Sequence, residues 1–106
     1  MTKVQIDPGI CGFITLVTAE LNEDDEVKVE VRSGCKSVTD MMDVVGNVFD
    51  GVELCLKAPG SCIFYDYAKE HFPVHVACPV INGILKCVEA ECQLALKKDA
   101  SIVFVE

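Results

Sequence analysis

The sequence predicts an α+β fold in which a small, mainly antiparallel sheet has helices packed on one face. Three observations support this prediction. An apolar–polar alternation marks residues 27–32 as a strand, apolar residues recur at helical spacing after residues 37 and 79, and an apolar segment, Ser101–Val105, closes the chain. The predicted order is β-β-β-α-α-α-β. At 106 residues the chain has the usual size of one domain, so we expect a single domain over residues 1–106.

Three strands are predicted in the first third of the chain. Lys3–Ile6 is a short strand that ends at a Pro-Gly turn over residues 7–9. Phe13–Leu21 is rich in β-branched residues, and the polar residues 22–25 separate it from the alternating segment Val27–Arg32. We expect the last two strands to form a hairpin with one face toward solvent.

Three helices are predicted next. Ser37 with Asp40 has the spacing of a capping box, and we expect Ser61 to cap the second helix and Pro79 to be the first residue of the third. The predicted buried face of the first helix consists of Val38, Met41, Met42, Val45, Val48 and Phe49. That of the third consists of Ile81, Ile84, Leu85, Val88 and Cys92. Residues 52–57 suit a further helical turn, residues 72–77 an extended connector, and Ser101–Val105 a final buried strand.

Composition excludes several classes of function. No apolar run approaches the roughly 20 residues of a membrane-spanning helix, and the amino terminus lacks the pattern of a signal peptide, so we expect a cytoplasmic protein without a membrane partner. A net charge of −8 repels a phosphate backbone, so nucleic acid is not an expected partner. Acidic residues such as Glu89 and Glu91 are expected on solvated faces.

Seven cysteines in an odd set, with no signal peptide, indicate thiols or metal ligands rather than a disulfide framework. Cys35, Cys62 and Cys78 each fall at the predicted first turn of a helix, where unpaired N–H groups stabilise a thiolate. Cys11 lies in a Pro-Gly-x-Cys-Gly turn, which lets a ligand approach the backbone closely. His75 lies three residues before Cys78 and is a candidate ligand or thiolate partner.

The alternative for every cysteine is plain burial as a small apolar side chain. We expect this for Cys55, Cys87 and Cys92, which fall within helical patterns, and the sequence leaves it open for Cys62. No Cys-x-x-Cys zinc motif is present, so the fold itself must assemble any site. The predicted ligands are Cys11, Cys35 and Cys78, completed by Cys62 or His75, and soft thiolates suit zinc or an iron–sulfur cluster.

Three segments together resemble the N-terminal domain of the IscU/NifU iron–sulfur cluster scaffold family. They are Cys11-Gly12 opening a hairpin strand, Gly34-Cys35 leading into a helix, and Pro73-Val74 followed after three residues by Cys78, with successive cysteines 24 and 43 positions apart. The resemblance implies that the three cysteines hold a nascent cluster or zinc and accept sulfur from a cysteine desulfurase. The family's aspartate after Cys-Gly is replaced by Phe13 here, and its histidine before the third cysteine is replaced by Ala77. The chain therefore resembles the family as a divergent relative.

Three functions remain open at this point. The first is binding of zinc or an iron–sulfur cluster, and the second is a sulfur-carrier protein in which Cys35 or Cys78 accepts persulfide sulfur. The third is a non-catalytic interaction domain whose cysteines are buried and inert. The exposed edges of a small sheet are compatible with a homodimer.

Overall fold

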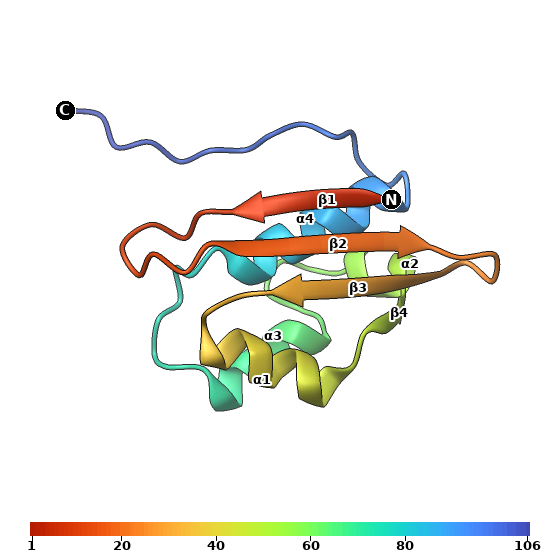
Figure 1. Ribbon diagram of the computed structural model, residues 1–106, viewed down its shortest axis with the longest axis horizontal. Helices are drawn as coiled ribbons and strands as arrows, with labels where there is room; N and C mark the ends of the chain where they lie inside the picture. Colours follow the sequence, from red (N-terminus) through yellow and green to blue (C-terminus); the bar gives the residue numbers. More distant parts are fainter.

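A computed structural model describes all 106 residues as an α+β protein with one sheet covered by helices (Figure 1). The strands are β1 Thr2–Ile6, β2 Thr15–Leu21, β3 Glu26–Arg32 and β4 Val48–Asp50. The helices are α1 Lys36–Val45, α2 Gly51–Cys55, α3 Ile63–His71 and α4 Val80–Glu91. All neighbouring strands are antiparallel, in the order β1-β2-β3-β4, which confirms the predicted fold class. None of the helices has the length and apolar character needed to span a membrane.

The two long strands alternate between a buried and a solvated face. Val17 and Ala19 on β2 and Val27 and Val29 on β3 are almost completely buried, and Ala19 pairs directly with Val29. The charged residues of β3 point to the opposite, exposed face. This is the predicted hairpin, and its inner face forms one wall of the core.

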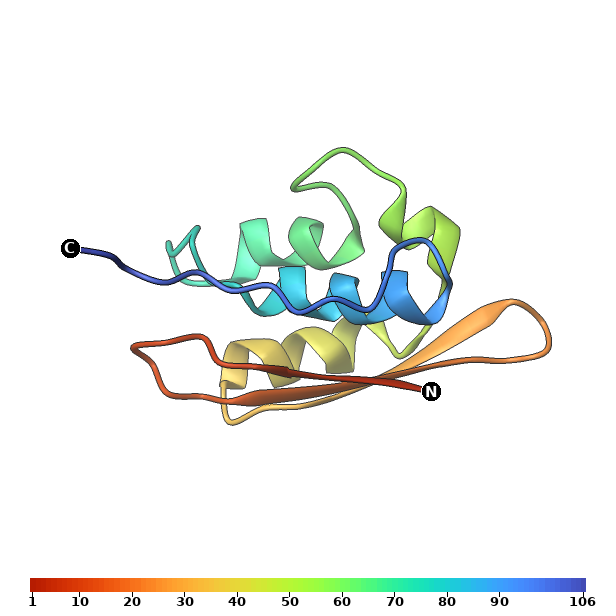
Figure 2. The same cartoon turned by 90° about the horizontal axis from the view of Figure 1, so that it is seen from above.

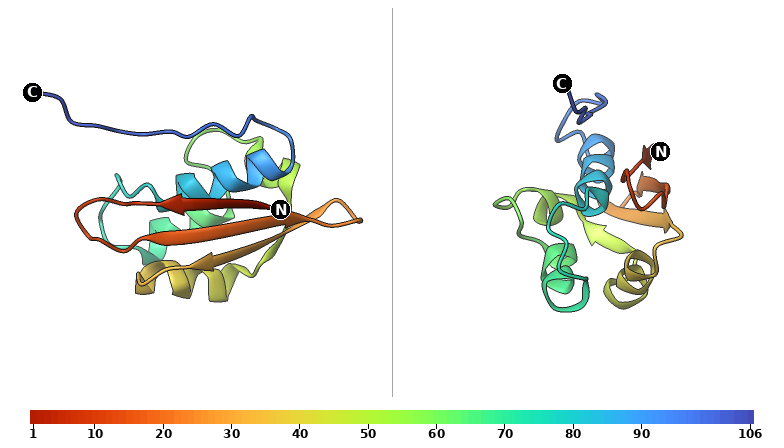
Figure 3. Two further views of the ribbon diagram at one scale, coloured as in Figure 1. Left: turned by 45° about the horizontal axis from the view of Figure 1, so that its top comes forward. Right: turned by 90° about the vertical axis from the view of Figure 1, so that its left-hand side faces the viewer.

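The helices all lie on this inner face (Figures 2 and 3). α4 lies against β1 and β2, while α1 packs on α3 and borders β3, and α2 packs on α4. Ile81, Ile84 and Val88 of α4 are buried, as their helical spacing predicts. Gly83 lets α4 approach β1 closely, because a Cβ at this position would overlap the side chain of Ile6.

The first predicted helix is too long at its end. Val48 and Phe49 continue the helical spacing in the sequence, but they belong to β4, which pairs with β3. Gly46 ends α1 with a backbone φ of +86°, a conformation that favours glycine, and its N–H donates to the Met42 carbonyl. The chain then turns back toward the sheet, and Val29 N–H donates to the Asn47 carbonyl.

The predicted final strand is also wrong. Ser101–Val105 forms no strand, and its apolar side chains are 74–98% exposed. The observed order is therefore β-β-β-α-β-α-α-α, in which the fourth strand follows the first helix and does not end the chain.

The helix starts differ from the predicted ones by one or two residues. Cys35 and Cys62 are the N-caps of α1 and α3, in place of the expected Ser37 box and Ser61. Asp40 binds Lys36 Nζ at 2.8 Å instead of closing a capping box. Pro79 is the N-cap of α4 and not its first residue, so α4 begins one residue later than expected.

Candidate thiol site

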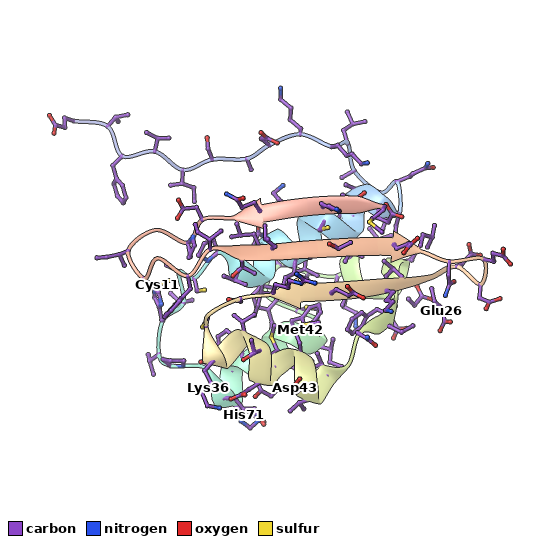
Figure 4. The ribbon with its side chains drawn as sticks, viewed as in Figure 1. Cys11, Glu26, Lys36, Met42, Asp43 and His71 are labelled. Atoms are coloured by element: carbon purple, nitrogen blue, oxygen red, sulfur yellow. The ribbon has the colours of Figure 1, made fainter.

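Cys11, Cys35 and Cys78 come from three separate segments at one end of the molecule. Cys11 lies on the loop between β1 and β2, Cys35 is the N-cap of α1, and Cys78 lies two residues before the start of α4. In Figures 1 and 2 all three segments lie at the end opposite the β2–β3 turn, and Figure 4 labels Cys11 there. We call this the cysteine end.

Phe13 brings the β1–β2 loop against the start of α1. A Cβ built on Gly34 would lie 2.9 Å from Cδ1 of the Phe13 ring, so the ring covers a position that a larger residue would fill. Phe13, two positions after Cys11, therefore contacts Gly34, the residue immediately before Cys35. Glycine at position 34 is what allows this approach.

Hydrogen bonds fix the backbone around Cys35. The hydroxyl oxygens of Thr15 and Ser33 lie 2.8 Å apart, which links the start of β2 to the end of β3. The Cys35 backbone N–H donates to Ser33 Oγ at 3.1 Å. Cys35 is thus held by a short network that involves the first residue of β2.

The thiol of Cys35 lies at the N-terminus of a ten-residue helix. Its backbone is extended, with φ −79° and ψ 116°, and no side chain caps the helix. The N–H groups of the first turn have no intrahelical acceptors, and the helix dipole is positive at this end. The first turn of α1 therefore presents unpaired backbone N–H groups next to Cys35.

The three thiols differ in exposure and do not form a preassembled metal site. Cys11 is exposed, whereas Cys35 and Cys78 are half-buried against the hydrophobic core. No three Cys, His, Asp or Glu side chains anywhere in the chain are grouped closely enough to hold a metal ion. The structure brings the cysteines to one end but does not bring their sulfurs into a coordination sphere.

The two candidates for a fourth ligand have contrasting positions. Cys62 is 2% exposed, so its sulfur belongs to the core. His75 is exposed on the connector between α3 and α4, and its neighbours Val74 and Val76 are fully exposed.

Comparison with known proteins places the chain in a family. A family model described as "Family of unknown function (DUF6951)" matches residues 2–104. The chain belongs to the DUF6951 family. No curated protein and no solved structure matches the chain.

The remaining cysteines of this DUF6951 protein are packed as apolar side chains. Cys87 is fully buried, its thiol donates to the Thr2 carbonyl at 3.3 Å, and burial raises its pKa to about 11. Burial also raises the pKa of Cys55, to about 12, and that of Cys92. These thiols stay protonated at neutral pH, as their positions within the helical patterns predict.

Two residues around the sheet were misjudged from the sequence. Phe13 appears in the sequence as an ordinary strand residue, and only the glycine at position 34 hints that a ring covers it. Glu91 was expected on a solvated face, but its side chain is 11% exposed and accepts hydrogen bonds from Thr2 and Leu21. A carboxylate at the end of a helix carries no sequence signal that distinguishes these two environments.

Proposed function

We propose that the cysteine end of this DUF6951 protein binds a thiophilic metal, as zinc or an iron–sulfur cluster, through Cys11, Cys35 and Cys78. The observation that carries the proposal is the arrival of three cysteines from distant parts of the sequence at one end of the fold. The contact of Phe13 with Gly34 supports it, because this contact draws two of the three segments together. The core cysteines are not part of the proposed site.

The three thiols have the right chemistry for a soft metal, but their sulfurs are not close enough together to bind one without a change in conformation. Thiolates are the preferred ligands of zinc and of iron–sulfur clusters. The sulfurs are not grouped, so binding requires the β1–β2 loop to move toward α1 and α4. Gly9 and Gly12 flank Cys11 with φ of +91° and +72°, and Ile10 is fully exposed, so this loop gives up little packing when it moves.

His75 is the better proposal for a fourth ligand. It lies on the connector that ends at Cys78, and residues 73–77 of this connector are exposed, so they give up little packing when the chain rotates. Cys62 is a weaker proposal, because exposing its sulfur would open the core around the start of α3. Imidazole with thiolates is a common zinc ligand set.

The proposed role is that of an iron–sulfur cluster assembly scaffold in the cytoplasm, with the cluster as cargo. The proposed partner is a cysteine desulfurase or another sulfur donor. The resemblance to IscU/NifU proteins in the order and spacing of the three cysteines supports this role. The net charge of −8 disfavours a nucleic-acid partner.

The test is elemental analysis and an absorption spectrum of protein expressed and purified without oxygen. We expect stoichiometric zinc or iron in the parent chain and its loss in Cys11→Ser, Cys35→Ser and Cys78→Ser. Cys92→Ser is the matched control, because it removes a thiol from the core and should retain the metal. A colourless, metal-free parent protein would contradict the proposal.

Gly34→Ala tests whether metal binding depends on the close approach of the β1–β2 loop to the start of α1. The added methyl must displace the Phe13 ring, which is 46% exposed and can rotate into solvent. We expect the thermal midpoint to change little and the metal affinity to fall by about tenfold, equivalent to about 1.4 kcal/mol. Unchanged affinity would show that the contact of Phe13 with Gly34 has no role in binding.

A second candidate function is a persulfide carrier that uses Cys35, and the position of this thiol at the N-terminus of α1 favours it. The Cys35 thiolate would attack the outer sulfur of a donor cysteine persulfide, and the donor would leave as a thiolate. This function predicts that Cys35 is alkylated far faster than the other six cysteines in metal-free protein at neutral pH. Uniformly slow labelling would contradict it.

A further inference from the structure

The last residues of the chain form an apolar segment with no partner. No backbone hydrogen bond that starts after Leu94 connects the tail to the rest of the protein. Ile102, Phe104 and Val105 are 89–98% exposed, although Ile, Phe and Val are the residues that strands favour. The segment therefore has the composition of a β-strand but no neighbouring strand to pair with.

The sheet has a matching free edge. β1 lies at the end of the strand order and pairs only with β2, so alternate N–H and C=O groups on its outer side have no strand partner. Figures 1 and 3 show the tail running along the β1 side of the molecule in the same direction as β1.

The tail is poorly placed to pair with β1 of its own chain. α4 ends beside the start of β1, where Glu91 binds Thr2, so the tail begins there. β1 spans about 13 Å, whereas Ile102 lies about 26 Å along an extended tail from Leu94. The apolar segment therefore overshoots β1, and Figure 1 shows the C-terminus beyond the β1–β2 loop.

We propose that Ser101–Val105 of one copy adds as a strand to the free edge of β1 in a second copy, and that the exchange is reciprocal. A two-fold axis perpendicular to the strands reverses their direction, so the tail becomes antiparallel to the β1 that it meets. The end of the tail then lies opposite the start of β1. Glu106 meets the positive charges of the Met1 ammonium and Lys3, which gives complementary charges at that point.

Sedimentation equilibrium of the metal-free, reduced chain tests the proposal, since these conditions exclude dimers formed by metal bridges or disulfides. We expect a concentration-dependent dimer. Ile102→Lys combined with Phe104→Lys should raise its dissociation constant at least about a hundredfold, because each copy loses two large buried apolar side chains. The tail makes no hydrogen bond with the folded part, so these substitutions leave the fold intact.

The matched control is Val44→Lys combined with Leu56→Lys, which removes one exposed apolar side chain from α1 and one from the residue after α2 and should leave the dimer unchanged. Amide exchange should show protection of β1 in the dimer that is lost when residues 101–106 are deleted. In a mixed sample of isotope-labelled and unlabelled chains, nuclear Overhauser effects between β1 and the tail should be observed between different chains. A monomer at every concentration, a dimer that survives the deletion, or tail–β1 contacts confined to single chains would each overturn the proposal.

Discussion

Glu91 joins the last turn of α4 to two strands, and its replacement tests how the helical layer is held on the sheet. Its Oε1 accepts a hydrogen bond from Thr2 Oγ1 at 2.7 Å, and its Oε2 accepts one from the Leu21 backbone N–H at 2.9 Å. The Met1 ammonium lies 3.5 Å from Oε1. One carboxylate thus binds the first residue of β1 and the last residue of β2.

The expected magnitude follows from these contacts. Hydrogen bonds to a charged group contribute about 1.5–3 kcal/mol each, but water can replace the carboxylate at the exposed Leu21 N–H. We expect Glu91→Ala to lower the free energy of unfolding by about 2–4 kcal/mol and Glu91→Gln by about 1–2 kcal/mol, because the amide keeps one acceptor.

The dependence on pH provides a second, independent readout. Burial alone would raise the pKa of Glu91, but the hydrogen bonds from Leu21 and Thr2 and the Met1 ammonium together hold it below the ordinary value. A pKa that is lower in the folded state means that the carboxylate stabilises the protein above its unfolded pKa of about 4.3. This contribution is lost as the pH falls through the folded pKa, and Glu91→Gln should lack it.

Urea unfolding at neutral pH and at a series of lower values down to about pH 3 measures both effects. Glu89→Gln is the matched control, because this carboxylate lies on the same helix and its side chain accepts no hydrogen bond. If Glu91→Gln changes stability no more than Glu89→Gln, and the pH dependence of Glu91→Gln parallels that of the parent chain, this account of Glu91 is wrong.

Three further predictions concern packing, backbone conformation and thiol reactivity. Gly83→Ala should destabilise the protein by about 1–3 kcal/mol in urea unfolding, because the methyl overlaps Ile6 in the core; an unchanged midpoint would contradict the close approach of α4. Gly46→Ala should cost about 1 kcal/mol through its positive φ, with no steric clash, and a stabilised variant would refute this. Mass spectrometry after alkylation at neutral pH should find Cys55 and Cys87 unmodified in the folded protein and labelled in urea, since burial raises the pKa of both; rapid native labelling would show that they are accessible.

The elements that the sequence predicted correctly are those whose two faces differ in environment. β3 alternates because one side meets the core and the other meets water, and α4 has a buried stripe for the same reason. The errors occurred where the spacing fits two structures. Val48 and Phe49 continue a helical pattern across Gly46, and only the backbone reversal at this glycine separates helix from strand.

The sequence indicated which cysteines lie near the ends of elements, but not how far apart their sulfurs are. Turn and cap positions placed Cys11, Cys35 and Cys78 near the ends of elements, and connectivity then brought those ends together. The separation of the sulfurs depends on loop conformations that no periodicity determines. The burial of Cys62 depends on how α3 is seated against the core, which a helix-start position does not reveal.

The proposed metal site and the proposed tail exchange involve different parts of the molecule, so their tests can be separated. The proposed ligands lie on the β1–β2 loop, α1 and the connector before α4, and none of them hydrogen-bonds to residues 95–106. Deletion of residues 101–106 should therefore abolish the dimer and leave the metal content of each chain unchanged, as elemental analysis and sedimentation of one preparation can measure. If the deletion removes both, the tail of the second copy must cover the cysteine end, and the site would belong to the dimer. If Cys35→Ser removes the metal while the dimer persists, two independent functions remain on one small fold, because the thiols and the free strand edge would then act separately.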